Sequence, residues 1–364
     1  MASPTDPRLA GGDRTDGGFA LWAEDVEETF QEAARSASVH DRRYRIGGHA
    51  VRLLFAGDAA HERLTRTFAH LETGSDDEPE LTVRLWDSST TGVGAPPVPP
   101  VAPDEDAPGA MYHLDDGRIK AVYQPGPQVL SVLDEERDAG CYWCQNAATI
   151  PFWDQAAPIR QILHHWLGAR GIQQVHGGAV GRADGGVLIV GQPGSGKSTC
   201  SLASVGSELL YAGDDYVAVS LEPEPRVHSL YCSGKLEHDH GKRFPRLQPF
   251  VTITDPSDDK GVVYAHEVAP EGTTPGFPLK AIIVPRVVGT GDTMITKASR
   301  VAALAALAPS TIIQLHVPRE GAFATMRKLI ESVPCYGLAL GEDVDDIPKR
   351  IGELLDRLAE GSAP

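Results

Sequence analysis

Long apolar runs, basic residues and cysteines are all scarce in this chain of 364 residues. No stretch approaches the roughly 18 apolar residues that a membrane helix needs, and the opening MASPTDPRLAGGDRTDGG lacks the regions of a signal peptide, so we expect a cytoplasmic protein without a membrane partner. Lys and Arg number 33 against 50 Asp and Glu, and the net charge of -17 argues against nucleic acid as a partner. Five cysteines, an odd number, favour reduced thiols over a disulfide framework.

The composition indicates a folded protein with more than one domain. Hydrophobic residues make up 41% of the chain and charged residues 23%, which excludes general disorder, collagen and coiled coil. The chain is too long for one ordinary core, and its 38 glycines and 28 prolines predict prominent loops. We therefore expect a disordered tail over residues 1–18, a β-rich α+β accessory domain over 19–150 and an α/β domain over 151–364.

Alternation of apolar and polar residues predicts several strands in the first domain. They are two strands within 44–55 around the Gly47-Gly48 turn and single strands over 80–86, 119–123 and 129–133. A helical pattern covers 61–71, and prolines crowd residues 88–108, which predicts a loop there. Cys141 and Cys144 form a single C-x-x-C without a second pair, so we expect neither metal nor redox chemistry at them.

Strands alternate with helices in the second domain, which predicts an α/β or mixed sheet. The strand candidates are 174–180, 187–190, 209–212, 217–221, 280–284 and 336–340, and helical patterns cover 158–171, 198–205, 299–308, 323–333 and 347–358. The first of these helices begins with Pro158 and ends with Gly171, and we expect His164 and His165 on its polar side.

A phosphate-binding loop motif lies within this domain. Residues 191–198, GQPGSGKS, match G-x-x-x-x-G-K-[ST], and they follow the apolar run 187–190 and precede a helical pattern. Gly191, Gly194 and Gly196 allow the backbone to turn with its N–H groups toward phosphate oxygens. The motif therefore predicts that the domain binds ATP.

The side chains of the motif suggest how ATP and Mg²⁺ are held. Lys197 supplies a point charge for the β- and γ-phosphates, and the hydroxyl of Ser198 is placed to bind Mg²⁺. Ser195 and Thr199 complete the residues that we expect around the nucleotide. The sequence thus predicts a magnesium-dependent nucleotide site.

Three further polar residues flank this motif. Asp214 and Asp215 stand between two strand candidates, where a carboxylate can complete the metal shell and another can accept a proton. His176 ends a strand candidate just before the loop, a position in which a lone histidine is more often structural than functional. A polar turn at the two aspartates is the alternative interpretation.

The motifs together resemble bacterial HPr kinase/phosphorylase and its wider HPr-kinase-like P-loop relatives, which share a nucleotide core with phosphoenolpyruvate carboxykinases. The resemblance rests on VHGGAV (175–180), GQPGSGKST (191–199) and LLYAGDDYVAV (209–219). It implies a mixed-sheet kinase core and, by size and N-terminal layout, the branch with serine kinases of lasso peptide precursors. The roles that it implies are His176 in the active site, Lys197 on the phosphates, Ser198 and Asp214 at magnesium, and Asp215 as the proton acceptor from a serine hydroxyl.

Two functions stay open at this point. The first is an ATP-dependent kinase that phosphorylates a serine-type hydroxyl of a peptide, protein or small molecule, with the first domain presenting that substrate. The second is an ATP-binding regulatory or scaffold protein without phosphotransfer, which Thr199 and Ala218 keep open because the catalytic family carries acids there. Self-association into a homo-oligomer is also left open. The additional cations that could assist catalysis are Lys235, Lys242, Arg243 and Arg286.

Overall fold

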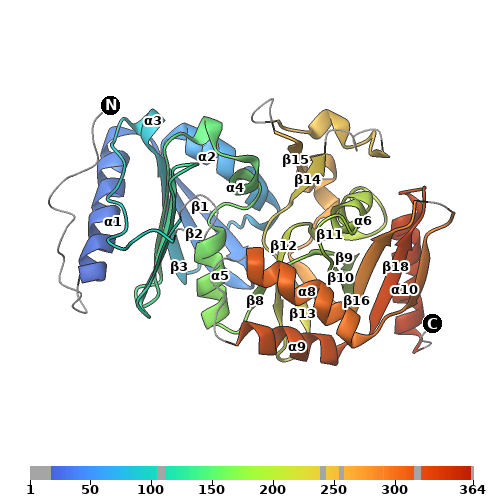
Figure 1. Cartoon of the computed structure of the whole chain (residues 1–364). Helices are drawn as coiled ribbons and strands as arrows, with labels where there is room; N and C mark the ends of the chain where they lie inside the picture. Colours follow the sequence, from blue (N-terminus) through green and yellow to red (C-terminus); the bar gives the residue numbers. More distant parts are fainter. Residues whose placement is uncertain are drawn as a thin grey trace. The chain divides into compact units, whose positions relative to one another are not determined.

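A computed structural model describes residues 18–104, 111–237, 243–253, 258–289, 291–314 and 321–361 (Figure 1). The chain divides into two compact units. Unit 1 contains the chain up to Tyr44, Ala50–Arg63 and Gly74–Ile150, and unit 2 contains Arg45–His49, Leu64–Thr73 and the chain from Pro151 onward. The two short segments of unit 2 were predicted to lie in the first domain. The predicted disordered tail lies outside the described residues except for Gly18, which begins a helix.

Unit 1 is built on a seven-stranded sheet. Its strands, in spatial order, are β1 (Val39–Ile46), β2 (His49–Ala56), β3 (Leu81–Asp87), β7 (Ala139–Cys144), β6 (Val129–Asp134), β5 (Ile119–Gln124) and β4 (Tyr112–Asp115). β3 runs parallel to both β2 and β7, whereas β4 to β7 pair antiparallel in sequence order. The C-x-x-C segment therefore lies within strand β7, and both of its cysteines are buried.

Helix α1 (Gly18–Ser36) belongs to unit 1 and was not predicted from the sequence. Its residues Trp22, Val26 and Phe30 recur at a spacing of four, so they share one face. That face packs in one apolar cluster with Trp86 and Trp143 of the sheet. Figure 1 shows this helix lying along the strands.

Short helices occupy two segments that the sequence described differently. The single helix predicted over 61–71 is instead α2 (Asp58–Leu64) followed by the 3-10 turn η2 (Arg66–Leu71). The predicted loop begins with the short helix α3 (Ser88–Thr91), in which the Asp87 side chain accepts a hydrogen bond from the Thr90 N–H at 3.0 Å. That cap satisfies a donor at the start of the helix, and Gly92 in the left-handed region ends it.

Unit 2 contains a nine-stranded mixed sheet. The strands in order are β11 (Leu210–Gly213), β9 (Gly178–Arg182), β10 (Gly185–Ile189), β16 (Gly276–Val287), β13 (Arg226–Ser229), β12 (Tyr216–Ser220) and β8 (Gln173–His176), with β18 (Cys335–Leu340) beside β16 and β17 (Met294–Lys297) beside β18. β16 runs parallel to β10 and β18, and the other pairs are antiparallel. The mixed α/β class predicted from the sequence is confirmed at this level.

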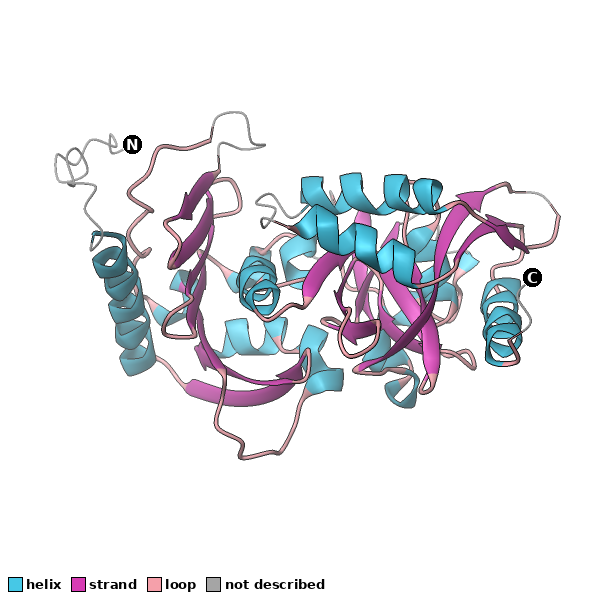
Figure 2. Cartoon of the chain, turned by 90° about the horizontal axis from the view of Figure 1, so that it is seen from below, coloured by secondary structure: helices cyan, strands magenta, loops and turns pink. Residues whose placement is uncertain are grey.

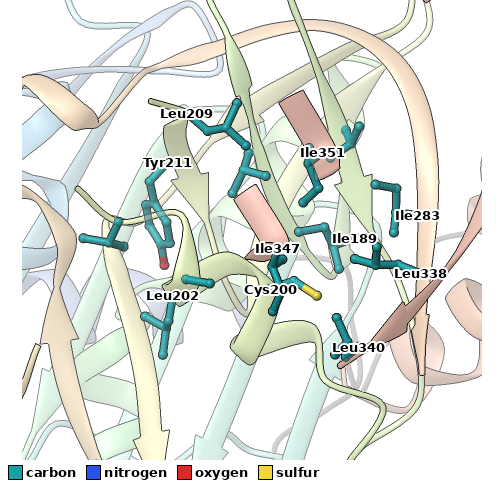
Figure 3. Close-up of a cluster of buried hydrophobic side chains, with 14 of the residues drawn as sticks. Ile189, Cys200, Leu202, Leu209, Tyr211, Ile283, Leu338, Leu340, Ile347 and Ile351 are labelled. Carbon is teal, nitrogen blue, oxygen red and sulfur yellow. The ribbon is translucent and has the colours of Figure 1, made fainter. Parts of the chain in front are cut away.

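Helices cover both faces of this sheet (Figure 2). They are α6 (Lys197–Ala203) and α10 (Asp346–Ala359) on one face and α8 (Arg300–Gln314) and α9 (Ala322–Ser332) on the other. Because strand side chains alternate, Ile189 of β10 joins the core under α6 and α10, whereas its neighbour Leu188 joins the core under α8 and α9. Figure 3 shows the first of these cores, in which Cys200 of α6 lies beside Ile347 of α10.

The remaining elements of unit 2 include a two-stranded sheet of β14 (Ser233–Glu237) and β15 (Lys260–Tyr264). Unit 2 also contains the helices α4 (Phe152–Ala156), α5 (Arg160–Ala169) and α7 (Ala265–Val268) and the 3-10 turns η5 (Gln248–Phe250) and η6 (Pro270–Gly272). The expectation that His164 and His165 lie on the polar side of α5 is wrong, because both side chains are buried. Among the described helices, none combines the length and the apolar character that a membrane crossing requires.

Candidate functional site

The predicted phosphate loop joins strand β10 to helix α6. Gly194 and Gly196 have φ values of 79° and 100°, a region that side-chain-bearing residues rarely adopt, and Gly196 lies directly before the first residue of α6. A Cβ atom on Gly191 would collide with the Ser195 hydroxyl. The backbone therefore favours glycine at positions 194 and 196, and a side chain at position 191 would require Ser195 to move.

The ammonium group of Lys197 donates hydrogen bonds to uncharged backbone carbonyl oxygens of this loop. The side chain is only 8% exposed, and Nζ donates to the carbonyl oxygens of Gly191 at 2.8 Å and Gln192 at 3.3 Å. Burial lowers the pKa of Lys197, and the negative charges of Asp214 and Asp215 oppose that shift. Backbone carbonyls are weaker partners for an ammonium than phosphate oxygens, so a bound phosphate would outcompete them.

A cavity of about 570 Å³ opens beside the loop. Its walls include these residues predicted from the sequence: His176, Gly194, Gly196, Lys197, Ser198, Thr199 and Asp215. Gly191, Ser195 and Asp214 do not line it, and the Ser195 hydroxyl is buried without a hydrogen-bond partner inside the loop. The structure thus brings His176 and Asp215, each about twenty positions from Lys197 in the sequence, to the same cavity as the loop.

Asp214 and Asp215 form the junction between β11 and β12, and their environments differ. Asp214 is 2% exposed; its Oδ2 accepts a hydrogen bond from the backbone N–H of Lys235 at 3.3 Å, and its Oδ1 is buried without a partner. Burial and then the charge of Asp215 raise the pKa of Asp214 to about 6, against the opposing effects of Lys235 and the Ser198 side chain. Asp214 is therefore a buried carboxylate with one oxygen that has no hydrogen-bond partner.

Asp215 by contrast has a partner on each oxygen. Oδ1 lies 3.0 Å from Nε2 of His176, and Oδ2 lies 2.5 Å from Nζ of Lys235. Burial alone would raise the pKa of Asp215, but the Lys235 ammonium and the His176 contact outweigh it and hold that pKa well below its usual range. Asp215 is therefore ionised at neutral pH.

The local fold places His176 opposite Asp215. β8 and β12 pair antiparallel with His176 beside Tyr216, and the Gly177 N–H donates to the Asp215 carbonyl oxygen at 3.0 Å. The His176 side chain is buried, and its Nδ1 has no hydrogen-bond partner. The strand predicted over 174–180 is in fact two strands, β8 and β9, which stand far apart in the sheet order. The break at Gly177 leaves His176 at the end of β8, next to the aspartates.

The residues around Ser198 suit a magnesium ion. The Ser198 hydroxyl and the unpartnered Oδ1 of Asp214 are hard oxygen donors, and a buried carboxylate oxygen is costly unless a cation or water meets it. Among the described residues, no three His, Cys, Asp or Glu side chains gather as a metal site. A magnesium ion held by one or two protein oxygens together with phosphates and water does not need such a group.

Further residues line the cavity. Phe152 and Trp153 of α4 and Lys260 were not assigned to the site from the sequence, whereas Lys235 and Arg243 were among the additional cations named there. No sequence motif marks the two aromatic residues. Lys242, named among the additional cations, lies outside the described residues, and Arg286 is not on the cavity wall.

Comparison of the chain with protein-family models finds no match, and comparison with curated proteins finds none either.

Proposed function

We propose that unit 2 binds ATP with Mg²⁺ and transfers the γ-phosphoryl group to a serine-type hydroxyl of a peptide, a protein or a small molecule. The observation that carries the proposal is the meeting in one cavity of the phosphate loop, Lys197 and Ser198 with the Asp215–His176 pair. A kinase needs phosphate ligands and a proton acceptor within reach of each other, and these are the two sets of groups present. The proposal places this activity in the cytoplasm, with HPr-kinase-like chemistry.

The chain's own residues then have separate tasks. The Lys197 ammonium leaves the carbonyls of Gly191 and Gln192 for the β- and γ-phosphates, while the loop N–H groups hold the phosphate oxygens. Mg²⁺, when bound, neutralises charge on the phosphate oxygens, and Ser198 and Asp214 would hold it.

Asp215 faces the acceptor. It accepts the proton of the hydroxyl while the hydroxyl oxygen forms its bond to the γ-phosphorus and the bond to the ADP oxygen breaks. Nε2 of His176 lies 3.0 Å from Oδ1 of Asp215 and orients this carboxylate. The other oxygen of Asp215, Oδ2, is then left for Lys235 or for the acceptor hydroxyl.

One observation favours the second candidate, an ATP-binding regulatory or scaffold protein. The pKa of Asp215 is lowered far below its usual range, which makes this carboxylate a weak base. The loop could then hold ATP without transfer. Both candidates predict nucleotide binding, and only the kinase predicts a labelled acceptor.

Binding of Mg·ATP to the full chain, measured by calorimetry, tests the first step. Lys197→Ala should weaken it by about 10- to 100-fold, because it removes a charged hydrogen-bond donor to phosphate. Lys349→Ala removes an exposed lysine of α10 and serves as the matched control, with unchanged binding. Absence of nucleotide binding by the unmodified chain would refute both candidates.

Radiolabelled ATP incubated with the chain and a peptide library or lysate tests the second step. Asp215→Asn should keep ATP binding and abolish label transfer to any acceptor. Undiminished transfer by this variant would remove Asp215 from the proton-accepting role. ATP binding with no labelled acceptor for the unmodified chain would support the regulatory candidate.

A further inference from the structure

Lys235 contacts both aspartates of the site. Its Nζ lies 2.5 Å from Oδ2 of Asp215, and its backbone N–H donates to Oδ2 of Asp214 at 3.3 Å. The Lys235 side chain is 16% exposed and lines the same cavity as Lys197 and Ser198. Lys235 is therefore a second lysine in the cavity, and it stands at the Asp215 end.

The backbone of Lys235 is held by close packing of β14 against α6. A Cβ atom on the preceding residue, Gly234, would come within 2.6 Å of the Leu202 side chain and 3.2 Å of the Tyr211 hydroxyl. That hydroxyl donates to the carbonyl oxygen of Ser233 at 2.8 Å. The backbone at Lys235 is thus fixed next to the phosphate-loop helix, while its four-carbon side chain can rotate within the cavity.

The charges in the cavity create a conflict that Lys235 can relieve. A terminal phosphate placed for attack by an acceptor beside Asp215 puts two anions close together, and like charges at short range repel strongly. Lys260, another lysine of the cavity, is paired with Glu237 at 3.1 Å. Lys235 already holds the Asp215 carboxylate, so it is the cation placed to stand between that carboxylate and a γ-phosphate.

We propose that Lys235 binds the γ-phosphate of the nucleotide and makes the site prefer ATP to ADP. This inference rests on the proposed nucleotide site. Without nucleotide the Lys235 ammonium pairs with Asp215, and with ATP it shifts to bridge Asp215 and the terminal phosphate. ADP lacks that phosphate, so Lys235 contributes little to binding it, whereas Lys197 contributes to the binding of both nucleotides.

Calorimetric titration of the full chain with Mg·ATP and with Mg·ADP tests this. Lys235→Gln should weaken ATP binding by about tenfold or more and change ADP binding by less than about twofold, because only one charged contact is lost. Lys349→Gln, at an exposed lysine of α10, is the matched control and should leave the ratio of the two affinities unchanged. Lys235→Arg keeps a cation at this position and should retain most of the preference for ATP. If Lys235→Gln does not fold, the ratio of ATP to ADP affinity in Lys235→Arg still tests the inference.

A double variant distinguishes direct contact of Lys235 with the γ-phosphate from mere neutralisation of the Asp215 charge by Lys235. Lys235→Gln leaves the Asp215 charge unbalanced, and that charge alone would repel ATP. In Lys235→Gln combined with Asp215→Asn the repulsion is absent, so continued loss of ATP preference supports direct contact, and its full recovery overturns the inference. Parallel loss of ATP and ADP binding in Lys235→Gln would show a structural role instead. If the unmodified chain binds neither nucleotide, the proposed function itself is wrong and this inference fails with it.

Discussion

At the scale of single residues, two adjacent carboxylates have opposite electrostatic environments. Asp214 has an oxygen with no partner and a raised pKa of about 6, whereas Asp215 has a partner on each oxygen and a lowered pKa. Neighbouring acids whose environments separate their pKa values commonly have different tasks in enzyme sites. Under the proposed function Asp214 would meet the cation and Asp215 the acceptor, which is the assignment that the sequence resemblance implied.

His70 provides a prediction about stability and pH. Its Nε2 lies 2.6 Å from the Ser229 hydroxyl in unit 2, its Nδ1 is buried without a partner, and burial lowers its pKa to about 3 from an ordinary 6.5. As pH falls below about 6.5, the unfolded chain binds a proton at His70 and the folded chain does not, so stability decreases. The contribution is at most about 1.4 kcal/mol per pH unit and is absent above that range.

Urea unfolding at pH 7 and pH 5 measures this effect. Between these two pH values the original chain should lose about 1–2 kcal/mol more than His70→Gln, which cannot titrate. The glutamine variant also controls for other buried histidines such as His228, whose pKa is lowered to about 4 and which stays in both chains. Parallel stability changes in the two chains would contradict the prediction.

At the scale of elements, strand β9 and helix α6 meet at a glycine. A Cβ atom on Gly178 of β9 would collide with the Ser201 hydroxyl of α6 and lie 3.1 Å from the carbonyl oxygen of Asp214. The close packing of β9 against α6 and against the backbone of Asp214 therefore depends on the absence of a side chain at Gly178. This packing determines the distance between Lys197 and the carboxylates.

Gly178→Ala should accordingly lower both the stability of the fold and the affinity of the proposed site for Mg·ATP. We expect a loss of about 1–3 kcal/mol in the free energy of unfolding, because the core must shift to admit a methyl group, and weaker Mg·ATP binding. Thermal unfolding and calorimetry measure the two effects. Gly74→Ala, where a Cβ meets open space, is the control and should change stability by less than about 0.5 kcal/mol. A Gly178 variant as stable as that control would refute the packing argument.

The elements also show where sequence patterns were sufficient. The predicted phosphate loop, residues 191–198, joins β10 to α6 as its glycines and flanking apolar run indicated, since those requirements are local. Helix α1 was missed although Trp22, Val26 and Phe30 have helical spacing. The predicted strand over 174–180 divides at Gly177 because its two halves pair with different strands, which is a property of the whole sheet.

At the scale of the whole molecule, unit 2 includes segments from the first half of the chain. The segment Leu64–Thr73 belongs to it, and the Cys232 N–H donates to the Thr67 carbonyl oxygen at 2.8 Å. The Thr67 hydroxyl donates to the Ala156 carbonyl oxygen at 3.0 Å, and Arg66 pairs with Glu267 at 2.7 Å. Unit 2 is therefore incomplete in a chain that begins at residue 151.

Phe68 tests this dependence in the full chain. Its side chain is fully buried and lies 5.5 Å from the Tyr231 ring between centroids. Phe68→Ala should lower the protection of backbone amides around β13 and β14 by about 3–5 kcal/mol, the usual cost of removing a buried aromatic ring. Hydrogen exchange followed by mass spectrometry resolves these strands.

Glu62→Ala, an exposed position nearby in sequence, is the control for that measurement and should leave the amides unchanged. Equal exchange in Phe68→Ala and in the original chain would mean that Leu64–Thr73 does not stabilise unit 2.

The sequence by itself determined the mixed α/β class and the loop between a strand and a helix, because each depends on neighbouring residues and on local backbone geometry. Only the tertiary structure decided that Lys235 pairs with Asp215, that His176 faces the same carboxylate, and that unit 2 takes in Leu64–Thr73. These contacts join residues from 20 to more than 160 positions apart. Packing between strands and helices sets such distances, and no pattern of neighbouring residues encodes them.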